Sequence, residues 1–383
     1  MKRIICITLS MLILTGCSAQ TSNVIKEPDE LEMIRTIGID LADDGYSVTI
    51  GTGVGLDGSP PTIRSGEGVT IDEALNVLKK TSRGQEPFYS HTEDIIISED
   101  VARAGIQDVI DFMARNSEMR IGTNILIAKG AKAQDIMTGS VGGKTGLTDM
   151  IEVMEQQITA LGAGYMFTCL DVAAGLAQGG SALMLAVELV DGDNLLDEKE
   201  KKLQPVGFGI FEDSRLKEFS PYELSPGITF LMDKLESINI EVETDMGTVG
   251  LALTDSKVDY QPVFLDDQLQ KLKITLETEM SITEAGGVTD LTSEKRRQEV
   301  GLKASEQILA NLQETLKFSK ELGTDFMAIG EKVELKAPFK YEKIQNSWQE
   351  RFSELEIELE VKTVLKRSYD MADPIRLSGG KNE

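Results

Sequence analysis

Residues 138–145 form a pattern that could bind a phosphate group. The stretch Thr138-Gly139-Ser140-Val141-Gly142-Gly143-Lys144-Thr145 ends in the Gly-Lys-Thr of a phosphate-binding P-loop. That motif needs a glycine where Thr138 stands, and it follows a strand, whereas residues 131–137 are predicted to be helical. We therefore interpret 139–146 as a glycine-rich loop whose role the sequence does not define. The glycines of 51–55 follow a predicted strand, but no helix opens after them, so they do not form a dinucleotide fingerprint.

The residues that could catalyse a reaction or bind a metal do not form a recognisable set. The chain has one histidine, His91, so a zinc site would depend on carboxylates, which suit zinc poorly. Ser90 precedes His91, but adjacent residues rarely converge as in a Ser-His-acid triad. Asp191, Asp193 and Asp197 lack the spacing of an EF-hand loop. We predict no catalytic residue, no cofactor and no bound metal, and therefore no enzyme.

One residue does have defined chemistry, the thiol of Cys17. A basic start, Lys2-Arg3, precedes an apolar run over residues 4–14, which is too short to span a membrane and has the length of a signal peptide. The run ends in Leu14-Thr15-Gly16-Cys17, which resembles the bacterial lipobox, whose cysteine receives a diacylglyceryl group. We predict cleavage after Gly16 and lipid attachment at Cys17, on the outer face of a membrane.

Cysteine content and charge fit an exported, lipid-held chain. Once Cys6 is removed with the signal and Cys17 is acylated, Cys169 remains, in apolar sequence surroundings that predict a buried structural thiol. The mature chain has 64 acidic and 37 basic residues, a net charge of −27. Such a surface repels nucleic acid and anionic lipid headgroups, so attachment to the membrane must come from the acyl chains on Cys17.

The sequence divides into segments of different character. We predict a signal peptide at 1–16, a lipidated tether at 17–30, an N-terminal mixed α/β domain at 31–195 and a C-terminal mixed α/β half at 203–383. The boundary is placed in residues 191–202, which are charged and have no apolar period. The second half is expected either as one unit or as two domains, about 203–262 and 263–370.

The elements that must position any site alternate between strands and helices. Strands are predicted at 32–40, 46–50, 95–97, 124–128, 182–190, 206–211, 238–243, 248–259, 271–283 and 355–365, and helices at 71–82, 101–115, 147–161, 225–235 and 294–322. Thr70 is predicted to cap the first helix and Gly323 to end the longest one. This pattern indicates an α+β or mixed α/β fold with small mixed sheets and packed helices.

The order of several short blocks resembles one known family, the C-subunit lipoproteins of spore germinant receptors, or Ger(x)C family. The blocks are Ile37-Gly38-Ile39-Asp40 with Asp44-Gly45-Tyr46; Gly66-Glu67-Gly68; Tyr89-Ser90-His91-Thr92 and Ile95-Ile96-Ile97; Val206-Gly207-Phe208-Gly209-Ile210-Phe211; Tyr222-Glu223-Leu224 and Gly227; Leu322-Gly323-Thr324-Asp325-Phe326 and Gly330; and Asn346-Ser347-Trp348. The chain departs from the family in having Ser18 and Ala19, not a tryptophan and an acid, after the cysteine.

The resemblance implies an elongated, extracytoplasmic lipoprotein of about three domains that is not an enzyme. It implies a place in the inner membrane of a bacterial spore, where the protein acts with two integral membrane receptor subunits in the response to nutrient germinants. Cys17 is the functional residue carried over. The alternative is a solute-binding lipoprotein of a transporter, which would need a cleft between two lobes lined with aromatic and polar groups.

Overall fold

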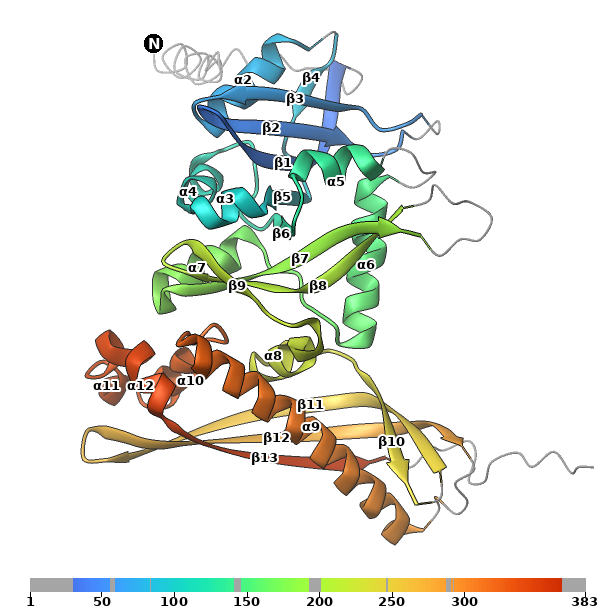
Figure 1. Ribbon diagram of the computed structural model, residues 1–383, viewed down its shortest axis with the longest axis vertical. Helices are drawn as coiled ribbons and strands as arrows, with labels where there is room; N and C mark the ends of the chain where they lie inside the picture. Colours follow the sequence, from blue (N-terminus) through green and yellow to red (C-terminus); the bar gives the residue numbers. More distant parts are fainter. Residues whose placement is uncertain are drawn as a thin grey trace, which may run out of the picture.

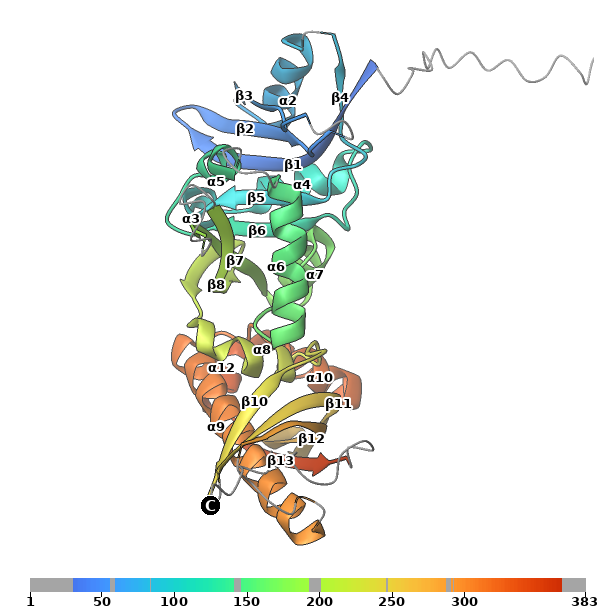
Figure 2. The ribbon, with the colours of Figure 1, turned by 90° about the vertical axis from the view of Figure 1, so that its right-hand side faces the viewer.

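The computed structural model describes residues 30–55, 59–82, 84–140, 146–192, 201–245, 247–286, 291 and 293–366. These residues form an elongated molecule in which two sheet-containing units follow one another along the long axis (Figure 1). Turned by 90°, the molecule shows α6 (Leu147–Leu161) running along this axis from the first unit toward the second (Figure 2).

The first unit contains a nine-stranded sheet with helices on its faces. Its strands are β1 (Leu31–Ala42), β2 (Gly45–Thr52), β3 (Ile63–Gly68), β4 (Glu86–Phe88), β5 (Asp94–Ser98), β6 (Asn124–Ala128), β7 (Ser181–Asp191), β8 (Lys201–Glu212) and β9 (Arg215–Phe219). Its helices are α2 (Ile71–Lys80), α3 (Glu99–Ala104), α4 (Gln107–Arg115), α5 (Ala133–Gly139), α6 and α7 (Cys169–Gly179).

The order of this sheet is β3-β2-β1-β5-β6-β7-β8-β9, with β4 paired to β1. The central pairs β1–β5, β5–β6 and β6–β7 are parallel, and the flanking pairs are antiparallel. Every residue of β5 is buried, because helices cover both faces of the parallel centre. This explains why the continuous run Ile95-Ile96-Ile97 reads as a buried strand.

The second unit combines a four-stranded sheet with one long helix. Its elements are the 3₁₀ turn η3 (Tyr222–Leu224), α8 (Ser225–Leu231), β10 (Asn239–Thr244), β11 (Gly247–Leu265), β12 (Gln268–Gly286), α9 (Glu294–Leu322), α10 (Ile329–Lys336), α11 (Pro338–Tyr341), η4 (Gln345–Ser347), α12 (Trp348–Glu354) and β13 (Glu356–Leu365). The sheet order is β10-β11-β12-β13, with β13 parallel to β12.

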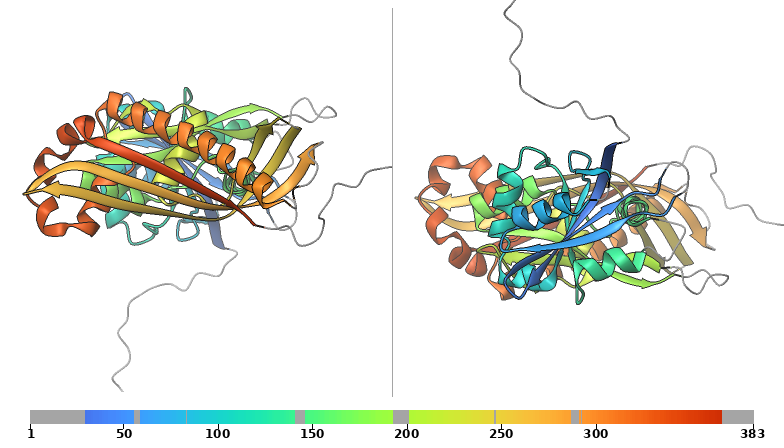
Figure 3. Two further views of the ribbon diagram at one scale, coloured as in Figure 1. Left: turned by 90° about the horizontal axis from the view of Figure 1, so that it is seen from below. Right: turned by 90° about the horizontal axis from the view of Figure 1, so that it is seen from above.

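Helix α9 lies along the second sheet, as the view from below shows (Figure 3). The predicted apolar stripe of α9 is buried: Val300, Ala304, Ile308, Leu312 and Leu316. Its predicted bounds, 294–322, are those of the structure, and it ends at Gly323, whose φ is +70°. The mixed α/β fold class and the long helix are therefore confirmed, since a stripe with steps of four residues fits a single buried face.

The predicted division into domains does not follow the sheets. Strands β7 and β8 pair from Ser181↔Glu212 to Asp191↔Lys201, so the first sheet continues across the boundary placed in residues 191–202. Strands β11 and β12 form one hairpin, so a division at 262/263 would cut it. Pairing between strands on either side of a charged stretch is not visible in composition.

The predicted helix at 101–115 is wrong in detail. It is two helices, α3 and α4, which are separated at Gly105 with a φ of +131°. The apolar spacing runs through both helices, so periodicity alone could not reveal the break. Helix α7, which begins at Cys169, was not predicted.

Candidate functional site

Several residues considered for chemistry lie outside the described part of the chain: Gly16, Cys17, Val141 to Thr145, Asp193 and Asp197. Asp191 is described and pairs with Lys201, their charged atoms 2.5 Å apart. Within the described residues, no group of three or more His, Cys, Asp or Glu side chains could hold a metal. No described helix is both long and apolar enough to cross a membrane.

The surroundings of His91 and Cys169 indicate structural roles for both side chains. His91 is exposed, and its ring lies 5.6 Å from the ring of Phe88, measured between centroids. Cys169 is fully buried at the start of α7, and burial raises the pKa of its thiol to about 12. The prediction of a buried thiol is confirmed, and such a thiol stays protonated and unreactive at neutral pH.

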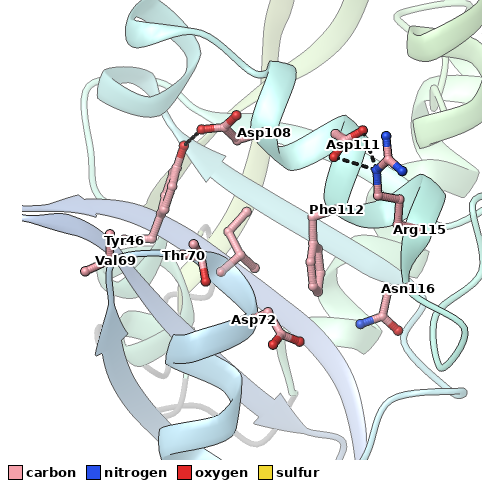
Figure 4. Close-up of a pocket in the computed structure, with 10 residues that line it drawn as sticks. Tyr46, Val69, Thr70, Asp72, Asp108, Asp111, Phe112, Arg115 and Asn116 are labelled. Atoms are coloured by element: carbon pink, nitrogen blue, oxygen red, sulfur yellow. Dashed lines mark hydrogen bonds and ion pairs between the residues drawn. The ribbon is translucent and has the colours of Figure 1, made fainter.

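A groove between α2 and α4 is a candidate binding site (Figure 4). It has a volume of about 470 Å³. Its floor and walls are apolar, formed by buried Ile71, half-buried Phe112 and Val69, which is 61% exposed. An exposed valine and a half-buried aromatic ring in one groove are surface that a second molecule could bury.

The rim of this groove is acidic. Asp72 comes from the first turn of α2, and Asp108 and Asp111 come from α4. Asp111 is bound by Arg115 Nε at 2.8 and 2.9 Å, so its charge is compensated. Tyr46 donates from β2 to Asp108 at 2.9 Å, and burial together with this hydrogen bond raises the tyrosine pKa to about 12. A cationic group fits this rim better than an anionic one.

The residues that carry the family resemblance are mostly structural. Asp40 is buried at the end of β1, and its carboxylate accepts hydrogen bonds from the N–H groups of Ala133 at 2.8 Å and Gln134 at 3.0 Å. It therefore caps α5 from a neighbouring strand. Gly38 lets that helix approach, because a Cβ there would lie 2.7 Å from Met137 Sδ.

Asp325 caps a helix in the second unit, as Asp40 does in the first. Its carboxylate accepts from the N–H groups of Ile329 at 3.0 Å and Gly330 at 2.7 Å, which caps α10, and from Trp348 Nε1 at 2.7 Å. Burial raises the pKa of this carboxyl, while these three donors act to lower it. Glycine is required at position 330, because a Cβ there would lie 2.5 Å from the hydroxyl of Tyr341.

The two units meet at Asp325. Its backbone carbonyl accepts from Ser181 Oγ of β7 at 2.8 Å, and its N–H donates to Gln349 Oε1 at 2.8 Å. The amide nitrogen of Gln349 in turn donates to the carbonyl of Gly179 at 3.1 Å. A cavity of about 380 Å³ lies at this joint, lined by residues of α7, α10 and α12. The hydrogen bonds of Asp325 and Gln349 therefore hold the second unit against the first.

The comparisons with known proteins place this architecture in the class of spore germination proteins. The family model described as "Spore germination protein N-terminal domain" matches residues 25–186, and the model "Spore germination B3/ GerAC like, C-terminal" matches residues 206–369. The chain belongs to the Ger(x)C family of spore germination proteins.

Individual relatives agree with this assignment. Spore germination protein KC of Bacillus subtilis (strain 168) is 23% identical over 398 residues, covering 96% of each chain. The putative spore germination protein YfkR of the same organism is 25% identical over 284 residues, 70% of each chain. The crystal structure of the GerBC protein has the same fold, with a TM-score of 0.58, 15% identity and coverage of 86% of this chain and 97% of that one.

The sequence did not reveal the groove or the roles of the motif aspartates. Asp40 and Asp325 were part of the resemblance, but no local pattern showed that each caps a helix that follows later in the chain. The acids at the groove come from two helices, α2 and α4, that are separated in sequence by β4, β5 and α3. One weak signal existed, namely Asp108 and Asp111 at helical spacing beside Phe112.

Proposed function

We propose that this protein is the lipid-anchored C subunit of a spore germinant receptor and that it acts by contact with integral membrane subunits, not as an enzyme. The acyl chains on Cys17 would hold it on the extracytoplasmic face of the spore inner membrane. The observation that carries the proposal is the match of both halves of the chain to spore germination family models. A relative with the same overall extent is a spore germination protein.

The distribution of charge supports anchoring by lipid. The chain has a net charge of −25, so electrostatic attraction to anionic headgroups is not available. Two or more acyl chains on one cysteine give stable attachment without a basic patch. The 13 residues between Cys17 and Leu31 span at most about 45 Å when extended, which would keep the first unit near the membrane. The comparisons give no support to the solute-binding alternative.

The first test concerns the anchor. Cells are fed a labelled fatty acid, and the wild-type protein is compared with the Cys17→Ala variant. We expect the label on the wild type only, and the variant in the aqueous fraction. Equal labelling of both proteins would contradict the proposed anchor.

The second test concerns the partners. The lipidated protein is isolated from detergent-solubilised spore membranes, and the proteins that accompany it are identified. We expect two integral membrane receptor subunits at near-equal stoichiometry. Recovery of a transporter permease in their place would favour the solute-binding alternative.

A further inference from the structure

The groove between α2 and α4 has the chemistry of a docking site for a peptide segment. A segment that lies in it can bury Val69 and the exposed part of Phe112 over the floor formed by Ile71. The volume of about 470 Å³ accommodates a few side chains and not a folded domain. The open form of the groove, between the start of one helix and the side of another, suits an extended or helical segment (Figure 4).

Two carboxylates at this groove accept hydrogen bonds from neutral donors. Asp108 accepts from the neutral hydroxyl of Tyr46, and Asp72 accepts from the neutral amide of Asn76 at 2.9 Å. Neither donor neutralises a carboxylate, in contrast to the pairing of Arg115 with Asp111. A cationic side chain in the groove would therefore gain a charge-assisted contact with either carboxylate.

The charges also decide between classes of occupant. A surface of anionic lipid would be repelled by Asp72 and Asp108. A second copy of the chain has a net charge of −25, so its approach is opposed at long range. A segment that carries Lys or Arg beside an apolar side chain complements both the rim and the floor.

The groove also lies in the unit in which the described part of the chain begins. Strand β1 begins at Leu31, and α2 and α4 belong to the same unit (Figure 1). We propose that this groove binds an extracytoplasmic segment of an integral membrane receptor subunit, with an apolar side chain between Val69 and Phe112 and a lysine or arginine at Asp72, at Asp108 or at each of them. This inference rests on the proposed function and names its contact surface.

The experiment places a photo-reactive residue at the rim of the groove in the full-length lipoprotein. Val69 is replaced by p-benzoylphenylalanine in cells that also make the two integral membrane subunits. Leu302, which is 61% exposed on α9, receives the same residue as the control position. After irradiation, each membrane subunit is detected by its own tag, and the cross-linked segment is sequenced.

The charge requirement is tested with matched variants. Asp72→Asn with Asp108→Asn removes two charges and preserves the shape of both side chains. The control pair is Asp100→Asn with Asp135→Asn, which removes two acids from the first turns of α3 and α5, away from the groove. We expect cross-linking from position 69 to fall about tenfold in the groove pair and less than about twofold in the control pair.

The outcomes separate this inference from the proposed function. Cross-linking to a membrane subunit at a segment with Lys or Arg, lost in the groove pair, supports the inference. Cross-linking to lipid or to a second copy, or equal loss in both pairs, overturns it. If the lipoprotein still co-purifies with both subunits but position 69 does not cross-link to them, the inference fails and the proposed function stands.

Discussion

The indole nitrogen of Trp348 donates a 2.7 Å hydrogen bond to Oδ2 of Asp325, and both side chains are buried. The same carboxylate caps α10, and the backbone of Asp325 binds the first unit through Ser181. One residue therefore connects a helix start, the tryptophan of α12 and the joint between the two units. Its conformation is fixed by partners on every side.

Replacing Asp325 should destabilise the protein strongly. Asp325→Ala would leave two backbone N–H groups and one indole N–H buried without an acceptor, and we expect a loss of about 4 kcal/mol in the free energy of unfolding. Urea unfolding of the mature protein, followed by the fluorescence of its single tryptophan, measures this. Glu342→Ala, at an exposed position nearby, is the control and should change stability by less than about 0.5 kcal/mol. A loss of under about 1 kcal/mol in Asp325→Ala would contradict the assigned role.

Asp94 should make stability depend on pH. Its side chain is buried at the start of β5, accepts from Asn124 Nδ2 at 3.1 Å, and has a pKa raised by burial to about 7. In the unfolded chain the pKa is about 3.9, so folding favours the protonated form. The contribution of Asp94 to stability is then greatest below about pH 4 and is lost as the pH rises through 7.

The variant Asp94→Asn isolates this effect, because the amide does not titrate. We expect the wild type to lose about 3 kcal/mol relative to the variant between pH 5 and pH 8. Urea unfolding at several pH values checks it. A difference between the two proteins that does not change with pH would show that Asp94 titrates normally in the folded state.

Gly207 should not tolerate a side chain. Its φ is +106°, and a Cβ would lie 2.2 Å from the carbonyl oxygen of Ser220. Gly207→Ala should cost about 3 kcal/mol or more, since both the backbone conformation and the contact with the Ser220 carbonyl, just after β9, are unfavourable. Gly130→Ala is the matched control, because its φ is +68° and nothing lies within 4 Å of the added atom. Thermal unfolding should show a much smaller loss, about 1 kcal/mol, for the control. Equal losses would show that the contact at Gly207 can relax.

We expect that the side chain of His91 neither catalyses a reaction nor binds a metal. The side chain is exposed and packs against Phe88, so His91→Ala should change stability by less than about 1 kcal/mol and leave germination intact. Calorimetry and germination rates of spores carrying the variant measure both effects. Stoichiometric metal in elemental analysis of the wild type, absent from the variant, would contradict this interpretation.

The sequence predicted local structure better than long-range structure. The bounds of α6 and α9 and the cap at Thr70, whose side chain accepts from Glu73 N at 3.1 Å, depend on neighbouring residues and were predicted correctly. The break at Gly105 and the parallel pairing of β13 with β12 depend on contacts between distant segments. The pairing of β7 with β8 on either side of residues 193–200 is likewise not visible in the composition of that stretch.

The candidate site was less predictable for the same reason. Its acidic rim includes Asp72 and Asp108, which line one groove because α2 and α4 pack on the same part of the first unit. Cys17, the predicted site of lipid attachment, is the opposite case, because its signal is contiguous in sequence. Its assignment therefore remains a prediction from the sequence.

The central claim, that an anchored protein acts by contact with membrane subunits, is tested most directly in spores that carry only a soluble form. The protein is exported with a cleavable signal and with Cys17→Ala, at native expression, and nutrient germination and the abundance of the two membrane subunits are measured. We predict a normally folded protein, germination reduced by about tenfold or more because the local concentration near the partners falls, and fewer membrane subunits at unchanged expression. Full germination with normal subunit abundance would contradict the account and would favour a diffusible binding role.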